Sequence, residues 1–105
     1  MAATGAQWVQ PMGYKHALAE TAVDILRHCA DPFDSGAMVE AIRTTDLTSL
    51  VGHVNFATGP VPNVCSTPVV GGQWTRGQRF PFDIAIAENQ QAPEIPVDAP
   101  FHALE

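Results

Sequence analysis

The sequence predicts an α+β fold in which two helices come first and three or so strands and an extended tail follow. Two kinds of periodicity lead to this prediction. An early segment has apolar residues every three or four positions, as amphipathic helices do, and later segments alternate apolar and polar residues, as half-buried strands do. In addition, residues 89–105 hold three prolines, which are incompatible with a helix or a central strand.

The first helix is predicted over residues 13–30, because the apolar residues there would line one face. These residues are Tyr14, Leu18, Ala22, Ile25, Leu26 and Cys29. Alanine and leucine, which favour helices, dominate the segment. We expect Asp31-Pro32 to end it, because the residue before a proline avoids the helical conformation. Another part of a protein has to cover such an apolar face.

A second, shorter helix is predicted over residues 35–45. Asp34 or Ser35 can cap it by accepting hydrogen bonds from its first amide groups. A helix of this length is unstable alone in water, so we expect it to pack on the first helix or on a sheet. Residues 44–49 are polar and indicate a connection.

Strands are predicted over residues 50–57, 68–75 and 80–87, where side chains follow the two-residue period of a half-buried strand. Gly52 indicates a bulge or a close backbone approach within the first of these segments. The last two segments flank Gly77 and predict a β-hairpin. Residues 59–68 hold three prolines and read as an irregular loop.

Residues 89–105 are predicted to form an extended tail along a surface. Their last two residues, Leu104-Glu105, resemble the pair that cloning leaves before a purification tag. On this interpretation residues 1–105 are a single piece of a longer protein, and the missing signal peptide says nothing about its compartment. A length of 105 residues suits at most one small domain.

The charge balance excludes two classes of partner. Eleven Asp and Glu residues stand against five Lys and Arg, which gives a net charge of −6. Nucleic acids and anionic membrane surfaces both select clustered cations, so we expect neither as a partner. Membrane insertion is not expected either, because no apolar run approaches the roughly 20 residues that span a bilayer.

Motifs for catalysis, cofactors or metals are not found in the sequence. It has no G-x-S-x-G, P-loop or G-x-G-x-x-G pattern, and Cys29 and Cys65 lack the spacing of zinc ligands. We therefore expect no enzymatic activity, cofactor or metal, and free thiols rather than a disulfide. An unrelated small α+β enzyme with Cys29 or Cys65 as its nucleophile is an alternative.

The order of several short motifs resembles a known family. The chain is similar to the last quarter to third of type I periplasmic substrate-binding proteins, which serve ABC transporters of the branched-chain amino acid and amide group. The resemblance rests on Gly13-Tyr14 opening a helix, and on Ala41–Leu47, Leu50–Phe56, Pro68–Trp74 and Asn89–Val97. One segment departs from the family, because Ala57–Cys65 replaces its usual Asp-x-x-Gly-Asp turn.

The resemblance implies a two-lobed α/β parent protein that binds a solute in the cleft between its lobes and closes by hinge motion. It implies an amino acid or amide-like solute, delivery to a transporter permease, and a periplasmic location with the signal peptide absent from this chain. The segment before the Gly-Tyr helix reaches the cleft in some members, which makes Gln7 and Trp8 candidate ligand-binding residues. Alternatively, Trp8 only anchors the helix entrance.

Two further expectations follow from the resemblance. Cytoplasmic amide-sensing regulators share the fold and are an alternative, which a signal peptide on the native protein would exclude. A piece cut from its parent would also leave Leu18, Ile25 and Leu26 uncovered, so we expect it to self-associate as a dimer or larger oligomer.

Overall fold

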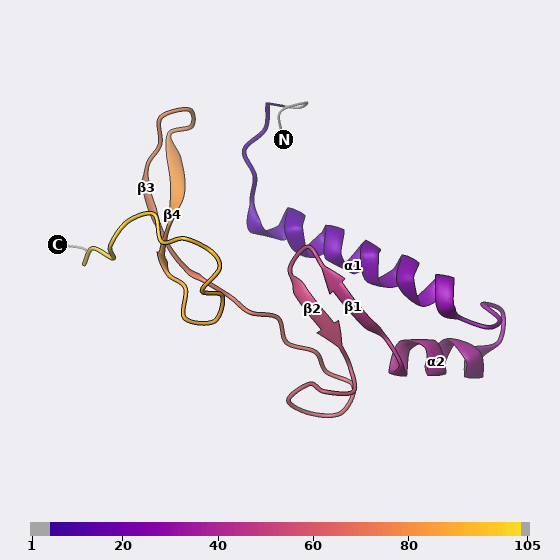
Figure 1. Cartoon of the computed structure of the whole chain (residues 1–105). Coiled ribbons are helices and arrows are strands. Elements are labelled where there is room, and N and C mark those ends of the chain that lie inside the picture. The colour runs from indigo at the N-terminus through magenta and orange to yellow at the C-terminus, as the bar shows by residue number, and fades with distance from the viewer. Residues whose placement is uncertain (1–4, 104–105) are drawn as a thin grey trace. The chain divides into compact units, whose positions relative to one another are not determined.

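The computed structural model describes residues 5–103, which form a small α+β arrangement of two helices and two antiparallel two-stranded sheets (Figure 1). The chain divides into two compact units, Met1–Thr67 and Pro68–Glu105. Its length had predicted at most one small domain. The boundary falls at the end of the proline-containing segment 59–68, where neither helical nor sheet hydrogen bonding continues.

The first unit begins with both predicted helices. α1 spans Gln10–His28, three residues earlier at its start than expected, because Pro11 lies in the first turn, where no amide hydrogen is needed. α2 spans Ser35–Arg43. The carboxylate of Asp34 caps α2 by accepting a hydrogen bond of 2.7 Å from the amide of Ala37.

A hairpin of two short strands follows the helices. β1 spans Asp46–Ser49 and β2 spans Gly52–Asn55, and they pair in antiparallel register. β2 lies inside the predicted strand 50–57, whereas β1 occupies part of the segment that reads as a polar connection. Gly52 explains the tight turn between them, because its φ of 118° is a conformation that other residues rarely adopt.

The buried face of α1 consists of small residues. Gly13, Ala17 and Thr21 recur every four positions and are buried, and α1 contacts β1. The hydroxyl of Thr21 donates to the carbonyl of Ala17 over 2.8 Å, so its burial leaves no polar atom unpaired. Large side chains of the predicted apolar face remain outside, with Leu18 72% and Leu26 54% exposed.

The second unit contains the predicted hairpin. β3 spans Gly71–Arg76 and β4 spans Phe82–Glu88, and their antiparallel pairing confirms the prediction of a hairpin around Gly77. Trp74 lies opposite Ile84 in the ladder. Gly72 is needed beside them, because a Cβ atom there would lie only 2.6 Å from Cγ2 of Ile84.

After β4 the chain makes two turns and then returns to the hairpin. Ala92 donates to the carbonyl of Asn89 and Ile95 donates to that of Ala92, both over 3.0 Å. Residues 96–103 form neither helix nor strand and bend at Ala99, and hydrogen bonds to β3 and β4 hold them. The extended tail along a surface stays a prediction, and its residues 104–105 lie outside the described part.

The chain buries little apolar material. In the described part, the buried hydrophobic residues are Ala17, Ala41, Val54 and Ala92. This arrangement is compatible with a piece of a larger domain. Between residues 5 and 103, no helix is both long and apolar enough to cross a membrane.

Candidate functional site

The two candidate ligand-binding residues lie just before α1. Val9 is the extended residue that precedes the helix, so Gln7 and Trp8 lie on the segment that leads into it. Gln7 is half-buried and Trp8 is 52% exposed. An indole that keeps half of its surface in solvent at a helix entrance is accessible to a small molecule.

A glycine in the first turns of α1 makes room for this tryptophan. A Cβ atom on Gly13 would lie 3.3 Å from Cζ2 of Trp8 and 3.9 Å from Cγ1 of Val51. The indole therefore lies close against the helix backbone at Gly13. Both predicted roles of Trp8 fit this position, because one side of the ring packs on the helix and the remainder is open.

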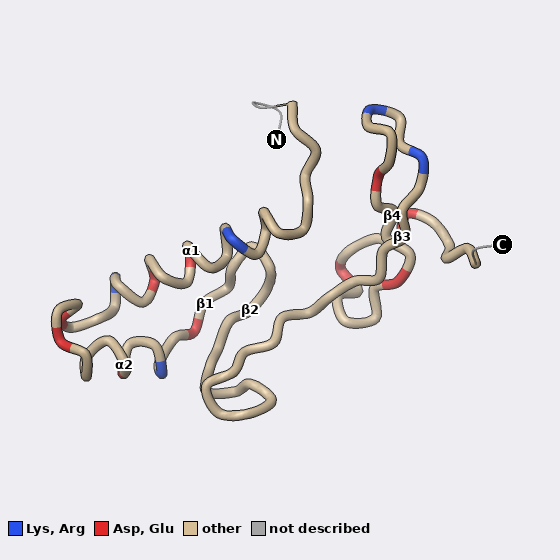
Figure 2. Tube along the Cα trace, turned by 180° about the vertical axis from the view of Figure 1, so that it is seen from behind, with Lys and Arg blue, Asp and Glu red and all other residues tan. Residues whose placement is uncertain are grey.

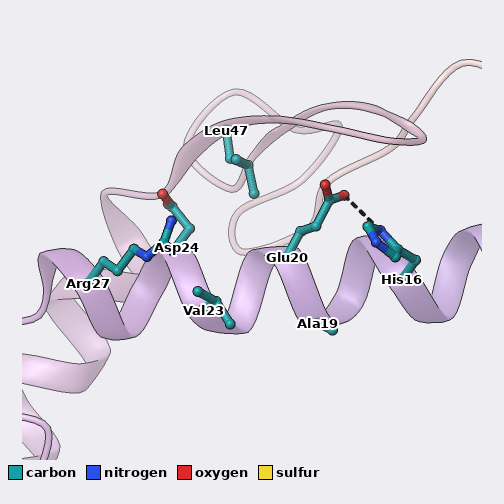
Figure 3. A pocket seen from close by; sticks show the side chains of 7 residues that line it. All are labelled: His16, Ala19, Glu20, Val23, Asp24, Arg27 and Leu47. Atoms are coloured by element: carbon teal, nitrogen blue, oxygen red, sulfur yellow. Dashed lines mark ion pairs between the residues drawn. The ribbon is translucent and has the colours of Figure 1, made fainter.

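A groove of about 350 Å³, lined by both charged and apolar side chains, runs along α1 beside β1 (Figure 3). Six of its lining residues come from α1 and one from β1, namely His16, Ala19, Glu20, Val23, Asp24, Arg27 and Leu47. The carboxylate of Glu20 lies 3.5 Å from Nδ1 of His16 and accepts a 2.9 Å hydrogen bond from the amide of Leu50.

The second carboxylate of this groove also has a partner. Asp24 lies 3.4 Å from Nδ1 of His28 one turn later on α1. The two carboxylates therefore interact with other groups of the same unit and do not converge on a common point. The bond between Glu20 and the amide of Leu50 attaches α1 to the β1–β2 hairpin. The groove therefore does not offer a preorganised set of groups for a ligand.

An apolar groove of about 280 Å³ lies elsewhere in the first unit. It is lined by Tyr14, Ala17, Leu18, Thr21, Val51, Val54, Phe56, Cys65 and Thr67. The hydroxyl of Thr21 is already bonded to the helix backbone. The lining is mainly hydrophobic, so the groove suits an apolar surface better than a polar solute.

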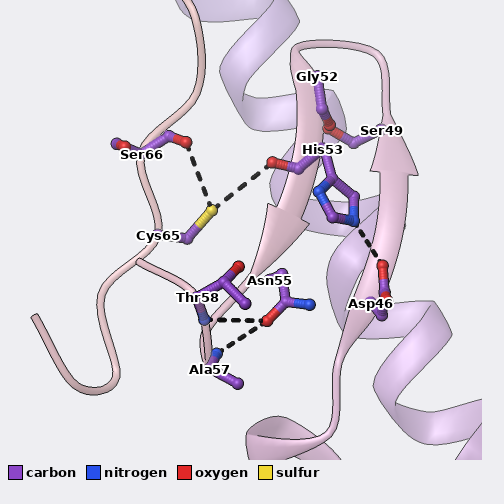
Figure 4. Close-up of polar contacts among 9 residues, drawn as sticks. All are labelled: Asp46, Ser49, Gly52, His53, Asn55, Ala57, Thr58, Cys65 and Ser66. Carbon is purple, nitrogen blue, oxygen red and sulfur yellow. Dashed lines mark hydrogen bonds and ion pairs between the residues drawn. The ribbon is translucent and has the colours of Figure 1, made fainter. Parts of the chain in front are cut away.

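The arrangement around Cys65 bears on the enzyme alternative (Figure 4). The sulfur lies 3.7 Å from the carbonyl oxygen of His53 and 3.8 Å from that of Ser66. The imidazole of His53 is turned instead to the carboxylate of Asp46 on the neighbouring strand. A cysteine nucleophile needs a base at its sulfur, and in this arrangement the imidazole is bound elsewhere.

The other thiol, that of Cys29, lies at the end of α1. Cys29 follows the last residue of α1, and both cysteines are free. Among residues 5–103, no three His, Cys, Asp or Glu side chains lie close enough together to hold a metal ion.

Figure 2 shows where charged residues lie along the described part of the chain. In the second unit, Arg76 and Arg79 lie at the turn between β3 and β4, and the guanidinium of Arg79 lies 5.4 Å from the ring centre of Phe80. Carboxylates occur on both helices and along the tail.

Several contacts that organise the units could not be found from sequence patterns. The carboxylate of Glu20 binds a backbone amide thirty positions away. The carboxamide of Gln73 binds the backbone of His102. Such contacts depend on where the chain returns in space, and no local pattern records that.

Comparisons with known proteins give no support for a family. The chain matches no family model, no curated protein and no solved structure.

Proposed function

We propose that this chain is part of a substrate-binding protein that captures a small amino acid or amide-like solute and delivers it to an ABC transporter. In this proposal the full-length protein works in the periplasm and has no enzymatic activity. Its partners are the solute and the transporter permease. The fold of the parent is the two-lobed α/β arrangement that the resemblance implies.

The order of the family-like motifs carries this proposal. Gly13-Tyr14 lies in α1 close to its start, and Ala41–Leu47 runs from the end of α2 into β1. Leu50–Phe56 contains β2, and Pro68–Trp74 leads into β3. Four of the five motifs thus fall on or beside helices and strands, whereas Asn89–Val97 lies in the turns after β4.

The exposed leucines of α1 also support the proposal that this chain is part of a larger protein. Leu18 and Leu26 project from α1 with most of their surface uncovered. In a two-lobed parent, a parallel sheet would cover this side of the helix. Each side chain would then contribute about 1.5–3 kcal/mol by leaving water, which the isolated chain does not gain.

The proposal is tested on the full-length protein by calorimetry with amino acids, short amides, urea and aromatic acids. We expect one class to bind, and Trp8→Ala to weaken that binding about tenfold, which corresponds to about 1.4 kcal/mol. Trp74→Ala is the matched control, because Trp74 is exposed on β3 and lies outside the family's cleft segment. Its affinity should equal that of the unmodified protein.

Two outcomes would contradict different parts of the proposal. Unchanged affinity in Trp8→Ala rejects Trp8 as a ligand contact and leaves it as the anchor of the α1 entrance. Absence of binding to every solute class, in a protein that is folded by circular dichroism, rejects the function. The native gene also separates the alternatives, because a signal peptide favours the transport protein and its absence favours the cytoplasmic sensor.

A further inference from the structure

Within the second unit, the tail that follows β4 is attached to the β3–β4 hairpin at two points. At the first point, the amide of Ile86 donates to the carboxylate of Asp98 over 3.0 Å, and the amide of Asp98 donates to the carbonyl of Ile86 over 2.8 Å. The amide of Ala99 adds a 3.3 Å bond to the same carbonyl. Both main-chain groups of Ile86 in β4 are therefore bound by the tail.

At the second point, a side chain of β3 binds the backbone of the tail. The carboxamide oxygen of Gln73 accepts from the amide of His102 over 2.9 Å, and its nitrogen donates to the carbonyl of His102 over 2.6 Å. This reciprocal pair imitates the bonds that two residues exchange in an antiparallel ladder. Because it contacts only main-chain atoms, it would hold any residue at position 102 except proline, which has no amide hydrogen.

We propose that residues 98–102 form a strap that covers the edge of β4 and opens as one unit while the β3–β4 hairpin stays folded. The chemistry of its attachment supports a reversible closure. Phe101 is 71% exposed and His102 is exposed, so apolar burial contributes little. Exposed hydrogen bonds individually contribute little net free energy, so a segment held by them alone opens before the rest of its unit.

Opening the strap would change what the hairpin presents to solvent. Both main-chain groups of Ile86 would lose their partners, and an unpaired strand edge can accept another extended chain. The closed strap thus protects this edge, and the bonds at Gln73 set how often it opens. The hairpin itself has additional support, because Trp74 faces Ile84 across the ladder.

Amide hydrogen exchange of the ¹⁵N-labelled 105-residue chain tests the proposal. We expect the amides of His102 and Ile86 to exchange at similar rates, about fivefold to thirtyfold slower than in an unprotected chain and faster than the amides of the β3–β4 ladder. Gln73→Thr removes the carboxamide and retains a good strand former. It should accelerate exchange at Ile86 as well as at His102, although Gln73 does not bond Ile86 directly.

The reciprocal variant, Asp98→Ala, should accelerate exchange at His102. Gln78→Thr in the hairpin turn and Glu94→Ala in the preceding tail are matched controls that should leave both rates unchanged. Phe101→Ala should also have no effect, because the bonds at Gln73 and Asp98 do not involve its side chain. Ladder amides that keep their protection show that each variant is folded.

Three results would each overturn the proposal. One is that His102 exchanges as fast as an unprotected amide in the unmodified chain. Another is that His102 and Ile86 exchange no faster than the ladder, which means that the strap opens only when the hairpin unfolds. The third is that Gln73→Thr changes His102 alone, which means that the two attachment points are independent.

Discussion

The imidazole of His28 donates a hydrogen bond from Nε2 to the carbonyl oxygen of Ala41, 2.8 Å away, and so connects the end of α1 to α2. Its Nδ1 lies 3.4 Å from the carboxylate of Asp24. The two ring nitrogens thus link three positions on two helices. We infer that His28 fixes the angle at which α2 follows α1.

The variant His28→Ala should destabilise the first unit by about 1 kcal/mol, at the centre of the range for a single hydrogen bond. The loss is not larger because the carbonyl of Ala41 also accepts from the hydroxyl of Thr45 over 3.0 Å. Urea denaturation followed by circular dichroism measures the change. His16→Ala is the control, since its contact with Glu20 is exposed and such ion pairs contribute little. Equal effects of the two variants would contradict the link.

Small size at Ala17 is required for the packing of α1. Ala17 is 5% exposed on the buried face of the helix, so Ala17→Leu has to displace neighbouring groups and should cost about 1–3 kcal/mol. Ala19→Leu makes the same change at an exposed position of α1 and should be close to neutral, because leucine is nearly as good a helix former as alanine. Thermal unfolding compares the two variants, and similar midpoints would reject the buried small-residue face.

The helices and the second hairpin were predictable because their signals are local. The spacing of apolar residues in the first helix, the aspartate cap at Asp34 and the glycine turn at Gly77 act through neighbouring residues, whereas the start of α1 at Gln10 was missed by three residues. β1 gave no such signal. It has four residues with Leu47 as its only large apolar side chain, so its pairing with β2 prevails over a polar sequence pattern.

The prediction of the candidate site rested on the family resemblance. Trp8 and Gln7 were chosen by their position before a helix, and neither lines the two grooves of the first unit described above. The carboxylate of Glu20 was missed because it binds the amide of Leu50 across the fold.

Alkylation rates test the enzyme alternative at Cys65. In a Cys29→Ser background, His53→Ala should change the rate of reaction with iodoacetamide by no more than about twofold, because the sulfur faces backbone carbonyls rather than the imidazole. Asp46→Asn, which alters the partner of His53, should likewise have little effect. A tenfold or larger slowing in His53→Ala would mean that the imidazole activates the thiol, and the enzyme hypothesis would then gain over the binding protein.

Association of the isolated chain is expected to depend on Leu18. This side chain is 72% exposed on α1, and Leu26, two turns further along the same side, is 54% exposed. Two copies that cover these leucines remove apolar surface from water, so we expect a dimer or larger oligomer at high protein concentration. Light scattering after size exclusion measures the mass. Leu18→Glu should shift the chain toward the monomer, because a carboxylate is costly to bury without a partner.

The control for that shift is Ala19→Glu, which adds the same charge at the next position of α1. Ala19 is exposed but small, so this variant retains the apolar side chains and should retain the oligomer. If both variants dissociate, net charge rather than the leucine surface controls association, since the chain already carries −6. If the unmodified chain is monomeric at high concentration, the exposed leucines do not drive association. The proposal that a sheet of the parent protein covers α1 would then lose this support.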